Sequence, residues 1–269
     1  MTAKKQEYSK KQELCDLQQE EISSLTKNYI KKSLTDYRVA SIDIQLIDPT
    51  VLYVELDSIV YFDDKKTAKD NSGIVAAVNY TMVQYGEADS VSKFGGAVRY
   101  SRILSAVDDS DPSITRNNTI LRMRRDMLAL EGTLASYEVC FTNEIKQDPA
   151  GGNVWSTGFT QQIDRNLDTK TYYFEDDGAG SLYSFYLDEN NNKIIDNKKY
   201  GTVDYAKGEV FIGYATPITI VNTTVSNSIV EIRAIPVGQD VIAEQSVYLS
   251  LDIAKSNINS IVDTKITGE

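Results

Sequence analysis

Hydrophobic and polar residues alternate over several segments of the N-terminal half, and a period of two residues predicts β-strands. The two clearest segments are VASIDIQLI (39–47) and TVLYVELDSIVYF (50–62), which the turn Asp48-Pro49-Thr50 separates. In the second segment the alternation changes phase at Ser58. We therefore expect two neighbouring strands, with a β-bulge at Ser58.

A period near 3.6 residues marks three other segments as helices. They are residues 11–35, GIVAAVNYTMVQYGE (73–87) and residues 97–107. Most amphipathic helices cover the core of their own domain, so the first segment is expected to do this, and docking onto a partner is the alternative. The order helix, strand, strand, helix predicts a small α+β module.

After Asn117 the strand pattern dominates, with turn signals at Asp177-Gly178, at Asn190-Asn191-Asn192 and at Gly208. We expect an α+β fold in which an N-terminal helix and a small α+β module precede a β-rich module of antiparallel hairpins. The expected divisions are an amphipathic helical arm (1–36), the α+β module (37–130) and the β-rich module (131–269).

Composition narrows the chemistry. The chain has 269 residues, of which 41% are hydrophobic and 25% charged, as in globular proteins. Its net charge of −11 argues against nucleic acid as a partner, because phosphates require clustered cations. The absence of histidine excludes Ser-His-Asp triads and histidine metal sites. Cys15 and Cys140 are expected to be free thiols in a reducing compartment. No apolar run is long enough to predict a membrane span.

Three acidic segments suggest metal binding or acid–base chemistry, but each has a simpler interpretation. Asp108-Asp109-Ser110-Asp111-Pro112 has the composition of a turn that ends a helix. Glu175-Asp176-Asp177-Gly178 is expected at an exposed hairpin tip. Residues 188–199 resemble a calcium-binding loop, but Lys193 and Lys199 stand where that loop requires glycine and a bidentate glutamate. We expect no catalytic residue, no metal and no cofactor.

The most informative segment is the arginine window, residues 99–125. It contains six of the nine arginines and three aspartates, so its net charge is +3 in a chain of net charge −11. Arginine pairs carboxylates through a planar fork and is enriched in interfaces. The window therefore predicts a subunit contact or a structural ion-pair network, against the default of a solvated basic face. The candidate residues are Arg99, Arg102, Asp108, Asp111, Arg116, Arg122, Arg124 and Arg125, with Trp155 as a possible contact aromatic.

Several of these segments together resemble the baseplate wedge proteins of contractile-tailed phages, in particular the C-terminal region of the large wedge subunit of the inner baseplate ring. The resemblance rests on SIDIQLIDPTVLYVEL, YSRILSAVDDSDPSITRNNTILRMRR, YEVCFTNEI, VWSTGF, YFEDDGAGSLYSFYLDENNNKII and KYGTVDYAKGEVFI, and covers residues 38–253. Family members are usually much longer, so the chain is expected to be a fragment, a short variant or one product of a split gene.

The resemblance implies a structural role in the virion. In the family this subunit pairs with itself and joins other wedge and tail proteins. Six wedges close around a central hub, and rearrangement of the baseplate triggers sheath contraction. The resemblance therefore implies that this chain is a late protein, that it forms a homodimer and that it assembles in the host cytoplasm. Positions that match Arg102, Asp108, Asp111, Asn117, Arg122 and Arg124 would be structural or contact positions.

Two other functions stay open from the residues alone. A carbohydrate-binding or adhesin-like β module at the tail tip would use Trp155 and the tyrosine-rich hairpins. A glycosidase would require two carboxylates about 5 to 9.5 Å apart in one cleft. The leading hypothesis is a structural component that is not an enzyme and has neither nucleic acid nor membrane as a partner.

Overall fold

The computed structural model describes residues 24–34, 46, 49–88, 91–163, 166–167, 169–213 and 217–265. The helices are α2 (Ser24–Leu34), α3 (Asn71–Glu87), α4 (Tyr100–Asp108) and the short 3-10 helix η2 (Val237–Gln239). The strands are β1 (Thr50–Phe62), β2 (Ala97–Val98), β3 (Ile114–Leu128), β4 (Leu134–Ala135), β5 (Tyr137–Cys140), β6 (Val154–Ser156), β7 (Phe159–Ile163), β8 (Asn166–Leu167), β9 (Tyr172–Asp176), β10 (Ser181–Leu187), β11 (Lys193–Asp204), β12 (Glu209–Ile212), β13 (Ile218–Thr223), β14 (Ile229–Ala234), β15 (Val241–Ile242), β16 (Val247–Leu251) and β17 (Asn257–Val262).

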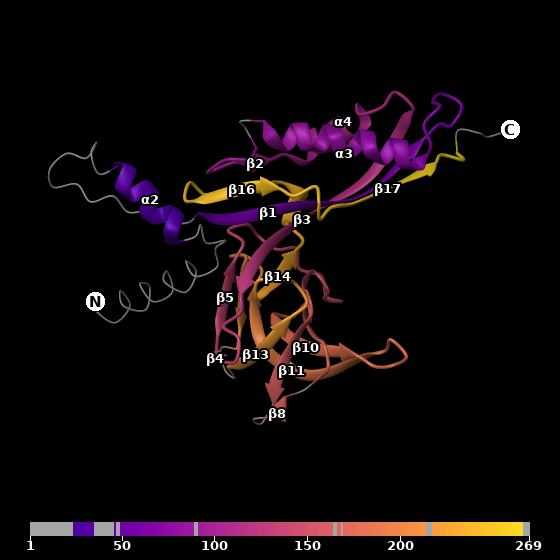
Figure 1. The fold of residues 1–269 in the computed structure, drawn as a ribbon. Coiled ribbons are helices and arrows are strands. Elements are labelled where there is room, and N and C mark those ends of the chain that lie inside the picture. Colours follow the sequence, from indigo (N-terminus) through magenta and orange to yellow (C-terminus); the bar gives the residue numbers. More distant parts are fainter. Residues whose placement is uncertain are drawn as a thin grey trace.

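The first part of the molecule is a layer of strands covered by helices. Strand β1 pairs with β3 along one edge in antiparallel orientation. Along its other edge it pairs with β16 and then β17, both parallel to it. Helices α3 and α4 lie over one face of these strands, at the top of Figure 1. We call this part the helical layer.

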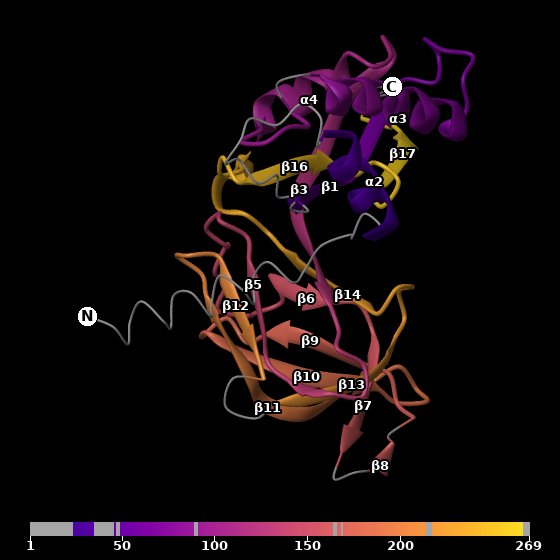
Figure 2. The same ribbon diagram turned by 60° about the vertical axis from the view of Figure 1, so that its left-hand side comes forward.

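The second part is a curled sheet. From β3 the strand order continues through β14, β6, β9, β10, β11 and β12 to β5. These strands curl into a half-barrel, seen below the helical layer in Figures 1 and 2. Strand β13 pairs with β4 and β7 beside this path. We call this part the half-barrel.

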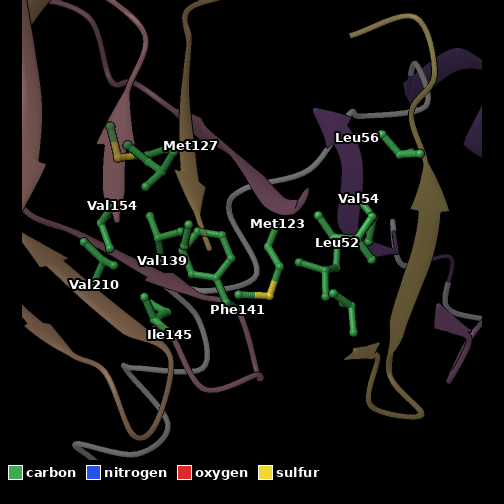
Figure 3. Packing of buried hydrophobic residues seen from close by; sticks show 14 of the residues in the cluster. Leu52, Val54, Leu56, Met123, Met127, Val139, Phe141, Ile145, Val154 and Val210 are labelled. Carbon is green, nitrogen blue, oxygen red and sulfur yellow. The ribbon is translucent and has the colours of Figure 1, made fainter. Parts of the chain in front are cut away.

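Strand β3 belongs to both parts. Its residues up to Arg124 pair with β1, and its last residues, from Met123, pair with β14. The buried hydrophobic residues of both parts form one cluster. Figure 3 shows Met123 of β3 between Leu52 and Val54 on one side and Phe141 on the other. The core is therefore continuous through the strand that the two parts share.

Strand β1 turns every second side chain from Leu52 to Phe62 toward the core. Leu52, Val54 and Leu56 are buried on this face, and Ser58 continues the series instead of shifting its phase. The expected bulge at Ser58 is therefore wrong. Its hydroxyl lies 2.7 Å from the Thr119 hydroxyl across the strand pair, which satisfies a polar group inside the core. The register shift of β1 and β3 lies instead between Tyr61 and Phe62.

The helices expected at 73–87 and 97–107 are present as α3 and α4. Helix α3 begins after Asp70, whose Oδ1 accepts a hydrogen bond of 2.8 Å from the backbone N–H of Gly73. Helix α2 covers the last part of the segment expected at 11–35, but Tyr29 is 76% exposed, so this side chain does not cover the core. Residues 11–23 and most of the strand expected at 39–47 lie outside the described residues.

The expected fold class is wrong. The structure is mostly β, with 46% of residues in strands and 16% in helices. An N-terminal helix and an independent α+β module do not describe it, because β1 pairs with β16 and β17 from the C-terminal end. Local periodicity predicts an element but does not identify the distant strand that pairs with it. The division near residue 130 stays a prediction.

Candidate functional site

Two arginines of β3, Arg122 and Arg124, lie where the helical layer meets the half-barrel. Arg124 is aligned with Tyr53 of β1 on one side and with Arg233 of β14 on the other. Two guanidinium groups therefore stand opposite each other on neighbouring strands. Like charges in this position destabilise a sheet unless a counter-charge reaches both.

Glu55 of β1 supplies that counter-charge. One carboxylate oxygen lies 2.7 Å from Nη1 of Arg124, and the other lies 2.8 Å from Nε of Arg233. Glu55 and Arg124 are each only 2% exposed. A buried charge that loses its partner is strongly destabilising, so the three residues depend on one another.

Arg124 has two further acidic partners. Its Nη1 lies 2.8 Å from Oδ2 of Asp252, and its Nε lies 2.9 Å from Oδ1 of Asp126. Its guanidinium carbon also lies 4.1 Å from the ring centre of Tyr53. Burial opposes the positive charge, but the surrounding carboxylates outweigh it and raise the pKa of Arg124 above its usual value. The side chain stays charged.

Buried Glu231 of β14 extends the network. It accepts a hydrogen bond of 2.8 Å from Nη2 of Arg233 and also pairs with Lys255. The participating residues come from β1, β3, β14 and the connection between β16 and β17, so they fix the two parts of the molecule against each other. We call this set the waist network: Glu55, Arg124, Asp126, Glu231, Arg233, Asp252 and Lys255.

Arg122 lies beside this network and is partly exposed. It forms an ion pair with Asp57 of β1, and Asp57 also accepts a hydrogen bond of 2.9 Å from Asn257. The guanidinium carbon of Arg122 lies 5.4 Å from the ring centre of Trp155 on β6. The possible contact aromatic is therefore itself in contact with the arginine window.

The remaining window arginines are spread over other places. Arg125 is buried and its Nη1 donates a hydrogen bond of 2.7 Å to the carbonyl of Val51. Arg102 lies exposed on α4. The six arginines therefore do not form one patch, because only Arg124 belongs to the waist network and only Arg122 lies beside it.

Arg99 and Arg116 each pair with a carboxylate from the C-terminal part of the chain. Arg99 lies 2.8 Å from Asp240, which also accepts a hydrogen bond from the backbone N–H of Tyr100 at the start of α4. Arg116 lies 3.2 Å from Asp263. Hydrogen bonding to Arg116, and then to a neighbouring threonine, lowers the pKa of Asp263 to about 2.

The two candidate aspartates shape the turn after α4, at the position where the composition predicted a turn. Asp108 accepts a hydrogen bond of 2.7 Å from the amide of Asn117. Asp111 is buried, lies 2.6 Å from Nζ of Lys69, and accepts a bond of 2.9 Å from the backbone N–H of Ser113. Bonding to Lys69, and next to Ser113, lowers the pKa of Asp111 to about 2.

These geometries favour structural over chemical roles. The carboxylates of the waist network are engaged by arginine or lysine, which leaves them acting as hydrogen-bond acceptors. A hollow of about 490 Å³ lies elsewhere, along β11, β12 and the turn between β9 and β10, with Gln147 and Tyr205 in its wall. The hydroxyl of Tyr205 donates to buried Asp176. Burial, and then this contact with Asp176, raises the pKa of Tyr205.

The described residues contain no group of three or more Cys, Asp or Glu side chains that could hold a metal ion. Asp188 of the segment that resembles a calcium loop instead accepts hydrogen bonds from the backbone of Asn190 and Asn192. Asp176, which was expected at an exposed hairpin tip, is buried and also accepts from the backbone N–H of Val154. No helix in the described part of the chain is long and apolar enough to cross a membrane.

Of the seven residues of the waist network, the sequence predicted only Arg124. Glu55 alternates with apolar residues, and neither it nor Glu231 and Arg233 carries a signal beyond strand alternation. Arg122 and Arg124 were found because arginines cluster in the sequence. The only sequence sign of their partners is the presence of charged residues on strands, which does not identify the strands that become neighbours.

Comparison with protein families bears on the same region. Residues 50–126, from β1 to near the end of β3, match the family model of the baseplate structural protein gp6, C-terminal domain III. No curated protein matches the chain. The match ends at Asp126, so it contains the β1 and β3 members of the waist network. Over this region the resemblance to phage baseplate wedge proteins is confirmed, because residues 50–126 are similar to a baseplate structural protein.

Proposed function

We propose that this chain is a structural component of a baseplate wedge that self-associates and joins neighbouring wedge proteins. In this role it forms part of the ring around the hub and couples to sheath contraction. The observation that carries the proposal is the family match over residues 50–126. Assembly of the virion tail in the host cytoplasm and expression as a late protein belong to the same proposal.

The waist network supports the proposed structural role. It joins strands of the helical layer to β14 of the half-barrel through buried charges. A subunit that transmits force between neighbours must keep its two parts, the helical layer and the half-barrel, in a fixed relative position. Most of the window's arginines find carboxylates within the chain, so contacts with neighbours would use other surfaces.

A capture experiment tests the assembly role. The full chain, carrying an affinity tag, is immobilised and exposed to a lysate of host cells infected with the phage that encodes it. Mass spectrometry should identify other tail baseplate proteins and untagged copies of the chain among the retained proteins. An excess of free, untagged chain should reduce the retention of the other baseplate proteins, which controls for non-specific binding to the support.

The outcome decides the proposal in either direction. Retention of baseplate proteins that the free chain competes away supports assembly in the wedge. A retained set without any tail protein contradicts it. Retention of baseplate proteins without untagged copies of the chain contradicts only the self-association and leaves the binding to neighbouring proteins supported.

A further inference from the structure

In the described part of the chain, no helix lies over one face of the helical layer. On this face Ile59 of β1 stands opposite Asn118 of β3 and Asn259 of β17. Ile120 on β3 and Ile261 on β17 lie diagonally on either side of Ile59. Their side chains are 40% and 47% exposed, respectively. A diagonal line of three isoleucines thus crosses three strands. We call these side chains, with Asn257, the open sheet face: Ile59, Asn118, Ile120, Asn257, Asn259 and Ile261.

The open sheet face has no unpaired charge. Asp57, which stands between Ile120 and Asn257 on the same face, pairs with Arg122, and at the border Arg116 pairs with Asp263. Within it, Asn259 donates a hydrogen bond of 3.0 Å to Asn257. The face therefore offers amide groups and branched apolar side chains.

This neutrality contrasts with the rest of the chain. The first 48 residues contain eight basic and eight acidic side chains, so the whole net charge of −11 belongs to residues 49–269. Two copies of such a body repel each other at most relative orientations. A face whose charges are paired within one copy is where two copies meet with little electrostatic cost.

We propose that the open sheet face is the contact between two copies of this chain, related by a two-fold axis. The inference rests on the self-association in the proposed function and specifies its surface. A two-fold contact places the same patch on both sides, so the patch must complement itself. Isoleucine packs against isoleucine, and an asparagine amide both donates and accepts hydrogen bonds, so each residue type can pair with its own copy.

The size of the face determines the strength of the contact. Three isoleucines and three asparagines bury less than the roughly 800 Å² per partner of a standard stable interface. The contact is therefore weak and concentration-dependent in solution. When neighbouring subunits hold two copies side by side, the effective concentration is high and the same contact becomes persistent.

Sedimentation velocity of the full chain, from micromolar to near-millimolar concentration, tests the surface. The original chain should shift from monomer to dimer as concentration rises. The double variant Ile120→Asp with Ile261→Asp should stay monomeric, because it places four carboxylates across the axis. Ile242→Asp on β15 is the matched control, since Ile242 is 46% exposed on a strand away from this face, and it should dimerise like the original chain.

Cross-linking gives an independent measurement if the double variant folds poorly. In a chain with Cys15 and Cys140 replaced by serine, Asn118→Cys and Asn259→Cys are made separately. These positions flank Ile59 at the centre of the face, so a short bis-maleimide should join two copies through at least one of them. The control Asn190→Cys, on the exposed β10–β11 turn, should give no cross-linked dimer.

The outcomes separate this inference from the proposed function. Dimers that survive the double variant, with no cross-link at either position, overturn the surface and leave self-association standing. A chain that stays monomeric at every concentration overturns this inference and self-association together. Binding of other baseplate proteins in the capture experiment would then still support the wedge role, with the open sheet face assigned to one of them.

Discussion

Glu55 illustrates how one residue can hold a charged interior together. It is buried between two arginines that stand opposite each other on neighbouring strands. Replacing an entire buried charge network by apolar residues is often neutral for stability, but removing one member leaves its partner uncompensated. The network therefore matters less for the stability it adds than for the one arrangement of β1, β3 and β14 that satisfies it.

We expect Glu55→Gln to lower the free energy of unfolding by about 3 kcal/mol, because Arg124 and Arg233 then repel each other without a shared carboxylate. Chemical denaturation followed by circular dichroism measures the loss. The double variant Glu55→Gln with Arg233→Met should recover part of it, since one of the two uncompensated charges is gone.

The matched control is Asp57→Asn, which removes a carboxylate from the partly exposed pair with Arg122 on the same strand. Exposed pairs contribute little, so a loss below about 1 kcal/mol is expected. Equal losses for the two single variants, or no recovery in the double variant, would show that Glu55 does not neutralise both arginines.

The pKa of Asp111 predicts a pH dependence. Its folded-state pKa is about 2, against an ordinary value of 3.8, chiefly because Lys69 donates to it. The unfolded chain therefore takes up this proton first as pH falls, so the stabilisation is complete above the ordinary value and is lost towards pH 2. Asp111→Asn should be less stable at neutral pH, with the difference narrowing as pH falls from about 4 to about 2.

Urea midpoints at a series of pH values would measure this narrowing. Asp108→Asn is the control, since Asp108 is an exposed carboxylate in the same turn. A difference between Asp111→Asn and the original chain that stays constant down to about pH 2 would exclude the shifted aspartate as its source.

At this scale the sequence was sufficient to find the arginines but not their partners. Six arginines in 27 residues are a statistical anomaly that is visible without any structure. Glu55 and Arg233 lie far apart in sequence and meet only because β14 pairs with β3 beside β1. An ion pair depends on positions within about 4 Å, and local patterns carry no information on such distances.

Among the elements, the β11–β12 hairpin is one whose turn conformation can be predicted from its own residues. Gly208 was expected in a left-handed turn, and its φ is +70°. This is confirmed, because a turn conformation is dictated by the residues within it. A Cβ at this position would also lie 2.1 Å from the carbonyl oxygen of Asn143, so two separate effects exclude other residues.

We expect Gly208→Ala to destabilise the chain more than Gly132→Ala. Gly132 has a similar φ of +68° but open space where the Cβ would stand, so its substitution measures only the left-handed strain, about 1 to 2 kcal/mol. The additional loss at Gly208 measures the clash with Asn143. Thermal unfolding of both variants gives the comparison, and equal losses would mean that the Asn143 loop moves away at no cost.

Strand β1 shows where element-level reasoning fails. Its position was predicted well, but Ser58 was read as a change of phase because serine is polar. In the structure Ser58 faces the core with Thr119 as its partner. A buried polar residue and a solvated one look the same in the hydrophobic pattern, and only the cross-strand neighbour distinguishes them.

For the whole molecule, the pairing of β1 with β16 and β17 overturned the expected fold class. A module formed by residues near one another in sequence was the natural expectation for a helix, strand, strand, helix order. The chain instead closes its helical layer with its C-terminal strands. Parallel pairing over such a separation leaves no local trace, since each strand has the same alternation whichever partner it finds.

This topology predicts that the molecule unfolds as one unit. The helical layer requires β16 and β17, which lie after residue 130, and the half-barrel requires the last part of β3, which lies before it. Each part therefore combines strands from both sides of residue 130. Fluorescence of Trp155, which reports on β6, and far-UV circular dichroism should therefore give coincident denaturation curves. Residues 131–269 expressed alone should lack a cooperative transition, because β14 loses β3 while β16 and β17 lose β1. A separate transition for Trp155, or a cooperatively folding 131–269 fragment, would instead establish the division near residue 130 as a true domain boundary.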